Sequence, residues 1–173
     1  MINDSPIARW SVLIIVAFTM MMGYFITDVM SPLEQLLEQP IDKGGLGWSS
    51  ADYGFFSGSS GFIIVFLLML FFSGLILDKM GVRFTGVLSC SLMIIGVLIK
   101  LYAITAPLAH QTFHLHILSF IDIRLPLSAA LASLGCAVFG VGYEMCGITV
   151  SKVMVRWFTG YELASAMGIQ LAM

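Results

Sequence analysis

Residues 74–83 of this chain read Gly-Leu-Ile-Leu-Asp-Lys-Met-Gly-Val-Arg and stand between two long apolar runs. The stretch holds one acid, two bases and two glycines. Because charged side chains are costly inside hydrocarbon, the flanking segments must bring this stretch to an aqueous face. The stretch is also short, so the flanking helices must be antiparallel neighbours. We therefore predict a structured joint between two membrane-spanning helices.

The composition indicates a membrane protein. The chain is 59% hydrophobic and 10% charged, and its mean hydropathy is +0.99. This leaves too little polar surface to cover a water-soluble globule. A helix needs roughly 20 apolar residues to cross a hydrocarbon core about 30 Å thick. We predict an all-α polytopic membrane protein with spans at 10–30, 53–77, 84–106 and 125–155, and an incomplete fifth span at 162–173.

Local signals mark the ends of the first two runs. Pro32 predicts that the first helix stops just before it, because proline cannot continue a helix. Ser49 or Ser50, together with Asp52, predicts the N-terminal cap of the second span.

The Lys and Arg residues predict the orientation of the spans. Connections rich in these residues stay on the cytoplasmic side of a membrane. One side holds most of the bases, and the N-terminus lies on that side. We therefore predict a cytoplasmic N-terminus in a plasma membrane or bacterial inner membrane, or in the lysosomal membrane if the protein is eukaryotic. The cytoplasmic bases are Arg9, Lys79, Arg83, Lys152 and Arg156, and the opposite side holds Lys43, Lys100 and Arg124.

Lys100 lies within the predicted third span, about 24 Å along the helix axis from Phe84. We expect its long side chain to extend outward to the membrane surface, as lysines near helix ends do. The alternative is a cation with a functional role inside the helix bundle.

Three histidines, His110, His114 and His116, lie between the third and fourth spans. His110 and His114 would share one face of a helix and could bind a metal ion or sense pH. No cysteine or acid cluster completes a metal site, so we predict no metal there. We expect an amphipathic segment at the membrane interface instead.

The predicted fourth span carries an acid, Glu144, deep within its apolar run. A carboxylate that meets hydrocarbon costs about 3 kcal/mol or more, so Glu144 must face a water-filled cavity or a partner. It shares a helical face with Cys136, Gly140, Gly147 and Ser151. We expect a central solute cavity on this face, with a buried structural pairing as the alternative. Glu144 could accept a proton or hold a cationic group such as an amine.

Tyr24 and Asp28 lie near the end of the first span, four residues apart on one helical face. We expect Tyr24 to line the same cavity as Glu144. Asp28 has two alternative locations. It could line the cavity, or it could lie in the water at the cavity exit.

The joint resembles a known loop signature. Gly74, Asp78, Lys79, Gly81 and Arg83 match the pattern G-x-x-x-D-[RK]-x-G-x-[RK] that the major facilitator superfamily carries between its second and third helices. The resemblance implies a cytoplasmic loop, in agreement with the Lys and Arg distribution. It also implies a secondary transporter of about twelve helices. This chain would then be its N-terminal portion, cut within helix five, and a missing C-terminal half-bundle would be its partner.

The loop residues suggest how such a joint would work. Gly74 and Gly81 would permit close helix approach and an abrupt turn. We expect the Asp78 carboxylate to accept hydrogen bonds from the N-terminal amides of a helix in the missing half. Arg83 or Arg156 could complete a charged latch that holds the cytoplasmic side closed.

Three further stretches, 24–28, 139–144 and 156–163, resemble the lysosomal dipeptide-transporter branch of this superfamily and its bacterial relatives. By this resemblance Glu144 and Asp28 are acids of helices four and one at a substrate cavity. The implied function is the transport of a small polar organic solute by alternating access. A dipeptide or amino-acid-like solute is favoured, and organic anions or other metabolites are the alternatives.

The sequence contains no Ser-His-Asp arrangement, metal-ligand cluster or phosphate-binding loop. We therefore predict no enzymatic activity and no cofactor. The expected partners are a small-molecule solute and the lipid bilayer, with no nucleic acid. Two alternative functions are compatible with the sequence. One is a non-transporting receptor or scaffold with the same fold, and the other is a channel-like pore.

Overall fold

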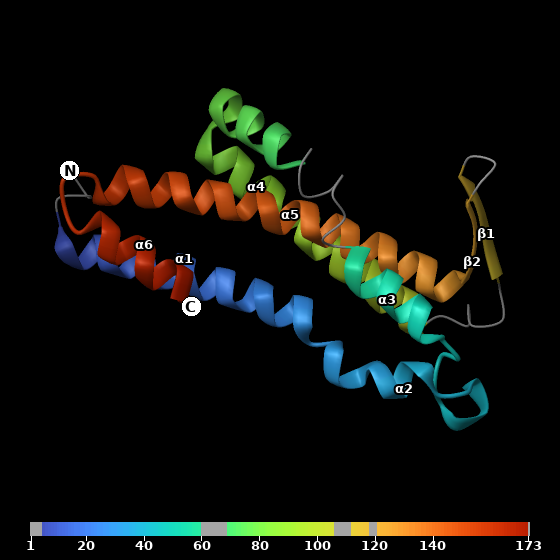
Figure 1. The fold of residues 1–173 in the computed structure, drawn as a ribbon. Helices are drawn as coiled ribbons and strands as arrows, with labels where there is room; N and C mark the ends of the chain where they lie inside the picture. The colour runs from blue at the N-terminus through green and yellow to red at the C-terminus, as the bar shows by residue number, and fades with distance from the viewer. Residues whose placement is uncertain (1–4, 60–68, 106–111, 118–120, 173) are drawn as a thin grey trace.

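The structure, a computed structural model, describes residues 5–59, 69–105, 112–117 and 121–172. Figure 1 shows α1 and α5 running alongside each other, with α6 packed against the first part of α1. In chain order the helices are α1 (Pro6–Asp28), α2 (Glu34–Glu38), α3 (Ser50–Gly58), α4 (Met69–Thr105), α5 (Leu127–Phe158) and α6 (Leu163–Ala172), and strands β1 (Thr112–Ile117) and β2 (Ile121–Pro126) lie between α4 and α5.

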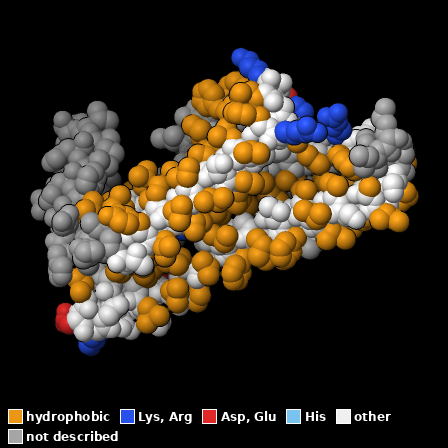
Figure 2. Space-filling model, turned by 180° about the vertical axis from the view of Figure 1, so that it is seen from behind, with side chains coloured by type: hydrophobic (Ala, Val, Ile, Leu, Met, Phe, Trp, Pro, Cys, Tyr) orange, Lys and Arg blue, Asp and Glu red, His pale blue; other side chains and the backbone are white. Residues whose placement is uncertain are grey.

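Three helical stretches within the described residues are long and apolar enough to cross a membrane. They are Pro6–Glu38, which joins α1 to α2 through a short 3-10 turn, Met69–Thr105 and Leu127–Phe158. Hydrophobic side chains cover most of the face in Figure 2, and Lys and Arg lie towards its edges. The predicted span 53–77 runs through residues 60–68, which lie outside the described residues, and α6 is too short to cross alone.

Helix starts follow local signals in the sequence. Pro6 occupies the first turn of α1, where its fixed φ suits the helix and its missing N–H is not needed. The predicted cap of the second span is confirmed at Ser49. The Ser49 hydroxyl accepts a hydrogen bond from the Asp52 N–H at 3.2 Å, and the Asp52 carboxylate accepts one from the Ser49 N–H at 2.8 Å.

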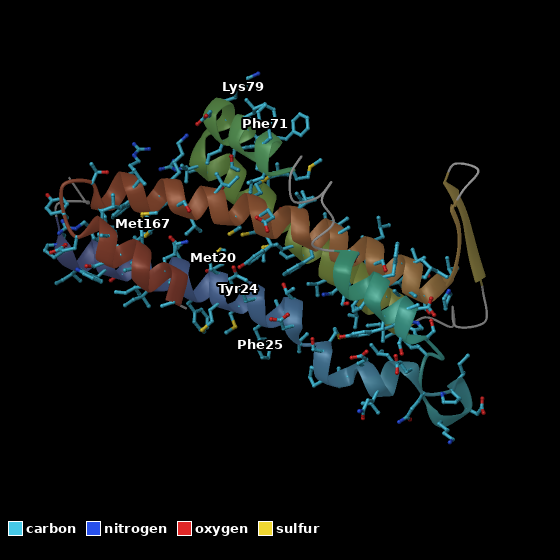
Figure 3. All side chains as sticks on the ribbon, in the orientation of Figure 1. Met20, Tyr24, Phe25, Phe71, Lys79 and Met167 are labelled. Carbon is cyan, nitrogen blue, oxygen red and sulfur yellow. The ribbon has the colours of Figure 1, made fainter. Side chains whose placement is uncertain are left out.

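α4 contains a sharp break at Gly81, inside the stretch that predicted a joint. Gly81 has φ 81° and ψ 169°, a combination that essentially only glycine adopts. The break separates residues 69–80 from residues 82–105. Figure 1 shows residues 69–80 projecting from the side of the bundle, and Figure 3 shows Phe71 and Lys79 on this segment. The chain therefore reverses its helix direction at a single residue, without a longer loop.

Gly81→Ala is expected to destabilise the protein, because a Cβ at this φ and ψ strains the backbone by about 1–3 kcal/mol. Gly74→Ala is the matched control, since Gly74 is helical and a Cβ built on it meets nothing within 4 Å. The control should be neutral or slightly stabilising. Thermal unfolding in detergent, followed by tryptophan fluorescence, measures both. Equal unfolding temperatures for the two variants would contradict the role given to Gly81.

α4 and α5 form the most extensive helix pair of the described structure, and glycines let their backbones approach closely. A Cβ built on Gly96 would lie 2.5 Å from the Phe139 nitrogen. One on Gly135 would lie 2.8 Å from the Gly96 carbonyl oxygen, and one on Gly142 would lie 2.7 Å from the Ser89 carbonyl oxygen. Real Cβ contacts are not this short, so the pair can pack only with glycine at these positions.

Two apolar clusters lie along α5, one near each of its ends. The cluster at the start of α5 includes Trp48, which is 2% exposed and donates a hydrogen bond from its indole N–H to the Ser128 hydroxyl at 2.9 Å. This first cluster consists of Leu37, Trp48, Tyr53, Phe56, Ala103, Ala129, Ala132 and Cys136. The second consists of Leu13, Met20, Cys146, Val150, Met154, Phe158 and Ala166.

The helical fold carries one β element that the sequence analysis did not expect. β1 and β2 form an antiparallel hairpin in which Thr112 pairs with Pro126 and Ile117 with Ile121. The helical face expected for His110 and His114 does not form, because His114 lies in β1; His110 lies outside the described residues. Apolar and polar residues alternate through 112–117 and 121–125, which is the period of a strand.

Candidate functional site

Glu144 lies on α5 and is half-buried. One turn further along, a Cβ built on Gly147 would lie 3.7 Å from the Met20 methyl group of α1, so this part of α5 approaches α1. Within the described part of the chain the Glu144 carboxylate has no hydrogen bond and no ion pair. A half-buried carboxylate without a partner keeps its bonding capacity for a ligand or a proton.

Tyr24 of α1 meets Tyr143, the residue next to Glu144. The two rings pack edge to face with centroids 5.1 Å apart, and Tyr143 in turn stacks on Phe139 at 6.3 Å. Gly23 makes this approach possible, since a Cβ built on it would lie 2.5 Å from the Tyr143 ring. Figure 3 shows Met20 and Tyr24 on successive turns of α1. The sequence analysis missed Gly23 and Tyr143, although both lie beside residues that it selected.

The Tyr143 hydroxyl is buried, and although it lies near the Tyr24 side chain, it forms no hydrogen bond of normal geometry with a described residue. Buried hydroxyls in folded proteins are nearly always satisfied, so this one marks a place where a water or a ligand atom would be stabilised. Tyr143 and Glu144 together therefore offer two adjacent polar groups on α5.

Asp28 does not join this group. It is exposed at the last residue of α1, and no contact links it to Tyr24 or Glu144 in the described structure. Of the three residues predicted for the cavity, the structure brings Tyr24 to the turn that carries Glu144 and leaves Asp28 exposed. The role of Asp28 stays a prediction.

Asp78 of the joint forms an ion pair with Lys152 of α5, with Asp78 Oδ1 2.6 Å from Lys152 Nζ. The side chains are 76% and 43% exposed, respectively. Lys79, Arg83 and Arg156 are exposed, and none of them forms an ion pair with another described residue. The basic partner of Asp78 is thus Lys152. The sequence analysis predicted this lysine to be cytoplasmic but did not predict its ion pair with Asp78.

Further contacts gather basic residues at the same end of α5. The Arg9 guanidinium lies 3.7 Å from the centroid of the Tyr161 ring, and Trp10 packs edge to face on Phe158 at 5.8 Å. Figure 1 shows the start of α1 beside the connection from α5 to α6. The predicted orientation requires these basic residues to lie at one end of the bundle, as they do here. That this end faces the cytoplasm stays a prediction.

Lys100 does not extend to the surface, so the expectation of an outward lysine is wrong. The residue is 6% exposed, and its Nζ lies 5.3 Å from the centroid of the Phe139 ring on α5. The physical reason is the rotation of α4, which turns Lys100 toward Gly135. A Cβ on that glycine would lie 2.8 Å from Lys100 Cγ, so the lysine stem fills the space that glycine leaves.

A groove of about 360 Å³ lies between α1 and α4. Its lining is almost wholly apolar, and it includes none of the residues predicted for the solute site. The lining residues are Thr19, Ile26, Cys90, Met93, Ile94, Val97, Leu98 and Phe139. Such a surface suits hydrocarbon or another helix better than a polar solute.

Comparisons of this chain with protein-family models, with curated proteins and with solved structures found no match.

Proposed function

We propose that this protein is a secondary transporter that moves a small polar organic solute across a membrane by alternating access. The observation that carries the proposal is the half-buried Glu144, which forms no hydrogen bond or ion pair with another described residue and lies on an apolar helix of membrane-spanning length. An ionisable group in such a helix is rare and marks a solute or ion pathway by default. The adjacent Tyr143 and Tyr24 supply polar and aromatic surface for an organic solute.

The ion pair between Asp78 and Lys152 fits a carrier that changes conformation. Both side chains are substantially exposed, and exposed pairs contribute only about 0–1 kcal/mol. A contact of this strength can bias one conformation and still break in every transport cycle. We propose that it acts as the latch between the joint and α5 on the cytoplasmic side.

By the resemblance of the joint to the major facilitator signature, we propose that the chain is the first part of a bundle of about twelve helices. The solute site would lie at its centre, between the two halves. A dipeptide or amino-acid-like solute is favoured by the stretches around Glu144, and the membrane would be a plasma, bacterial inner or lysosomal membrane.

Transport by the complete protein in proteoliposomes tests the proposal. Radiolabelled amino acids, dipeptides and organic acids are offered to vesicles with and without the protein. A carrier gives saturable uptake and counterflow, because each turnover requires a bound solute. A pore would give uptake without saturation, and a receptor would bind a solute without flux. Either of the latter two results would remove the proposed carrier function.

Asp78→Asn should shift the resting population away from the state with a closed cytoplasmic side and slow uptake. The shift should be up to about fivefold, which corresponds to the strength of an exposed ion pair. The double exchange Asp78→Lys with Lys152→Asp should restore uptake, whereas Lys43→Gln, on an exposed turn, should change nothing. The measurement is the rate of cysteine labelling on each membrane face. Unchanged labelling in Asp78→Asn would remove the latch.

A further inference from the structure

Lys100 is the most deeply buried lysine of the described structure. Only 6% of the residue is exposed, although it lies in α4, a helix of membrane-spanning length. Its ammonium is fully enclosed, and no described residue forms a hydrogen bond with it. A charged group in this situation is costly unless an anion or a set of hydrogen-bond acceptors compensates it.

The groups around the ammonium do not supply that compensation. The face of the Phe139 ring lies 5.3 Å from Nζ, and the Cys136 side chain also interacts with Lys100. A cation–π contact returns only part of the cost of burial, and a neutral thiol carries no counter-charge. Cys136 and Ser59 lie nearby. The Ser59 hydroxyl donates a 2.6 Å hydrogen bond to the Phe56 carbonyl and accepts none from the Lys100 ammonium. Neither side chain provides a carboxylate.

No acid among the described residues forms an ion pair with Lys100. Glu144, the acid of α5, is eight residues beyond Cys136, which is about 12 Å along the helix axis. Asp52 accepts the hydrogen bonds of the α3 cap, and Asp78 is paired with Lys152. Residues 60–68 and 106–111, which flank α4 in the sequence, contain no Asp or Glu. The described part of the chain therefore leaves the ammonium without a counter-charge, and a bound anion would supply one.

The first apolar cluster lies beside Lys100, toward the C-terminal end of α4. Ala103, one turn further along α4, is fully buried in that cluster with Trp48 and Phe56. The Phe139 ring and Cys136, a member of this cluster, thus lie near the ammonium. This is the surrounding expected for the charged end of an organic ligand, since the cation fixes the ligand's orientation and apolar groups cover its carbon atoms.

We propose that Lys100 forms an anion subsite that binds a carboxylate group of the transported solute. The proposal rests on the carrier function and names the class of solute, which is one that bears a carboxylate. Phe139 would cover the carbon next to the carboxylate, and Gly135 would hold the lysine stem in place. The solute would neutralise the buried ammonium on binding and leave it uncompensated on release. Binding should therefore depend strongly on this charge.

Matched pairs of acids and amides test the subsite in the complete, detergent-purified protein. The probes are dialanine against dialanine amide, and lactate against lactamide, each titrated at constant ionic strength while the unfolding temperature is recorded. A ligand that binds only the folded state raises this temperature. The acids should bind at least about tenfold more tightly than their amides, as expected for a charge-assisted hydrogen bond.

Three substitutions of Lys100 and one control substitution of Lys43 test whether Lys100 causes the acid preference. Lys100→Met and Lys100→Gln should abolish the acid preference, Lys100→Arg should retain most of it, and Lys43→Met should leave it unchanged because Lys43 is exposed. The comparison of acid with amide in the unmodified protein needs no variant, so it decides the matter even if a substitution prevents folding. An equal response to acid and amide, or no response to any probe, would overturn the subsite. So would an acid preference that survives in folded Lys100→Met or Lys100→Gln.

Uptake measured with the same probes separates the subsite from the carrier function. Lys100-dependent binding of acids without flux would keep the subsite and remove the carrier. Saturable uptake that is equal for acids and amides, and indifferent to Lys100→Gln, would keep the carrier and remove the subsite.

Discussion

Gly96→Val is expected to separate α4 from α5 and to abolish the native fold. A Cβ at residue 96 would lie 2.5 Å from the Phe139 nitrogen, 2.7 Å from the Gly135 carbonyl oxygen and 2.8 Å from the Phe139 Cα. All three are backbone atoms, so no side-chain rotation can relieve the overlap. Even Gly96→Ala should cost about 1–3 kcal/mol, in the range of overpacked cores.

Gly86→Ala is the matched control for this prediction. It lies on the same helix, and a Cβ there would meet only the Thr149 methyl group at 3.9 Å, an ordinary contact. The free energy of unfolding in mixed micelles, together with the elution profile after detergent extraction, measures both variants. Gly86→Ala should match the unmodified protein, while Gly96→Ala should unfold earlier and Gly96→Val should aggregate. A Gly96→Val protein with normal stability would show that the close contact of α4 with α5 does not support the fold.

The parts of the fold that follow from local sequence could be predicted. The apolar runs are visible in the composition of windows about 20 residues long, and three helical stretches of membrane-spanning length are found among the described residues. The cap formed by Ser49 and Asp52 depends on residues three apart. The break at Gly81 follows from glycine in a charged stretch that could not stay in hydrocarbon. Each of these signals acts within a few residues.

What could not be predicted depends on how helices rotate against one another. Lys100 was expected at the surface because its distance along α4 allows this, but the rotation of α4 directs it toward Gly135 and Phe139. One available signal was the recurrence of small residues at 85, 89, 96 and 103, in register with residue 100, which marks a helix face that packs closely. The partner of Asp78 is 74 residues away in the sequence, so no local pattern could identify Lys152.

The hairpin was missed for a different reason. Residues 105–124 were interpreted with the helical period because apolar helices surround them. The strict alternation at 112–117 and 121–125 favours strands. The candidate site was predicted in part, since the stretches with Tyr24 and Glu144 approach through Tyr143. The roles of Gly23 and Lys100 become visible only when α1 and α4 are placed against α5.

Glu144→Gln is expected to reduce saturable uptake by the complete protein at least tenfold while leaving its unfolding temperature almost unchanged. The carboxylate makes no hydrogen bond or ion pair with the other described residues, so its loss removes little from the folded state. A charge-assisted contact to a solute is worth about 1.5–3 kcal/mol, which corresponds to roughly 10- to 150-fold in affinity. Glu162→Gln, at an exposed residue before α6, is the control.

The two roles open to Glu144 give different results in the same variant. If Glu144 holds a cationic group of the solute, Gln should weaken both net uptake and counterflow, because both require a bound solute. If Glu144 instead carries a proton, Gln should abolish uptake driven by a pH gradient but preserve counterflow, since exchange of solute for solute moves no net proton. Glu144→Asp, which keeps the charge on a shorter chain, should recover part of either activity. Uptake and counterflow that both equal those of Glu162→Gln would mean that Glu144 has no part in the solute pathway, and the buried pairing would then be its remaining role.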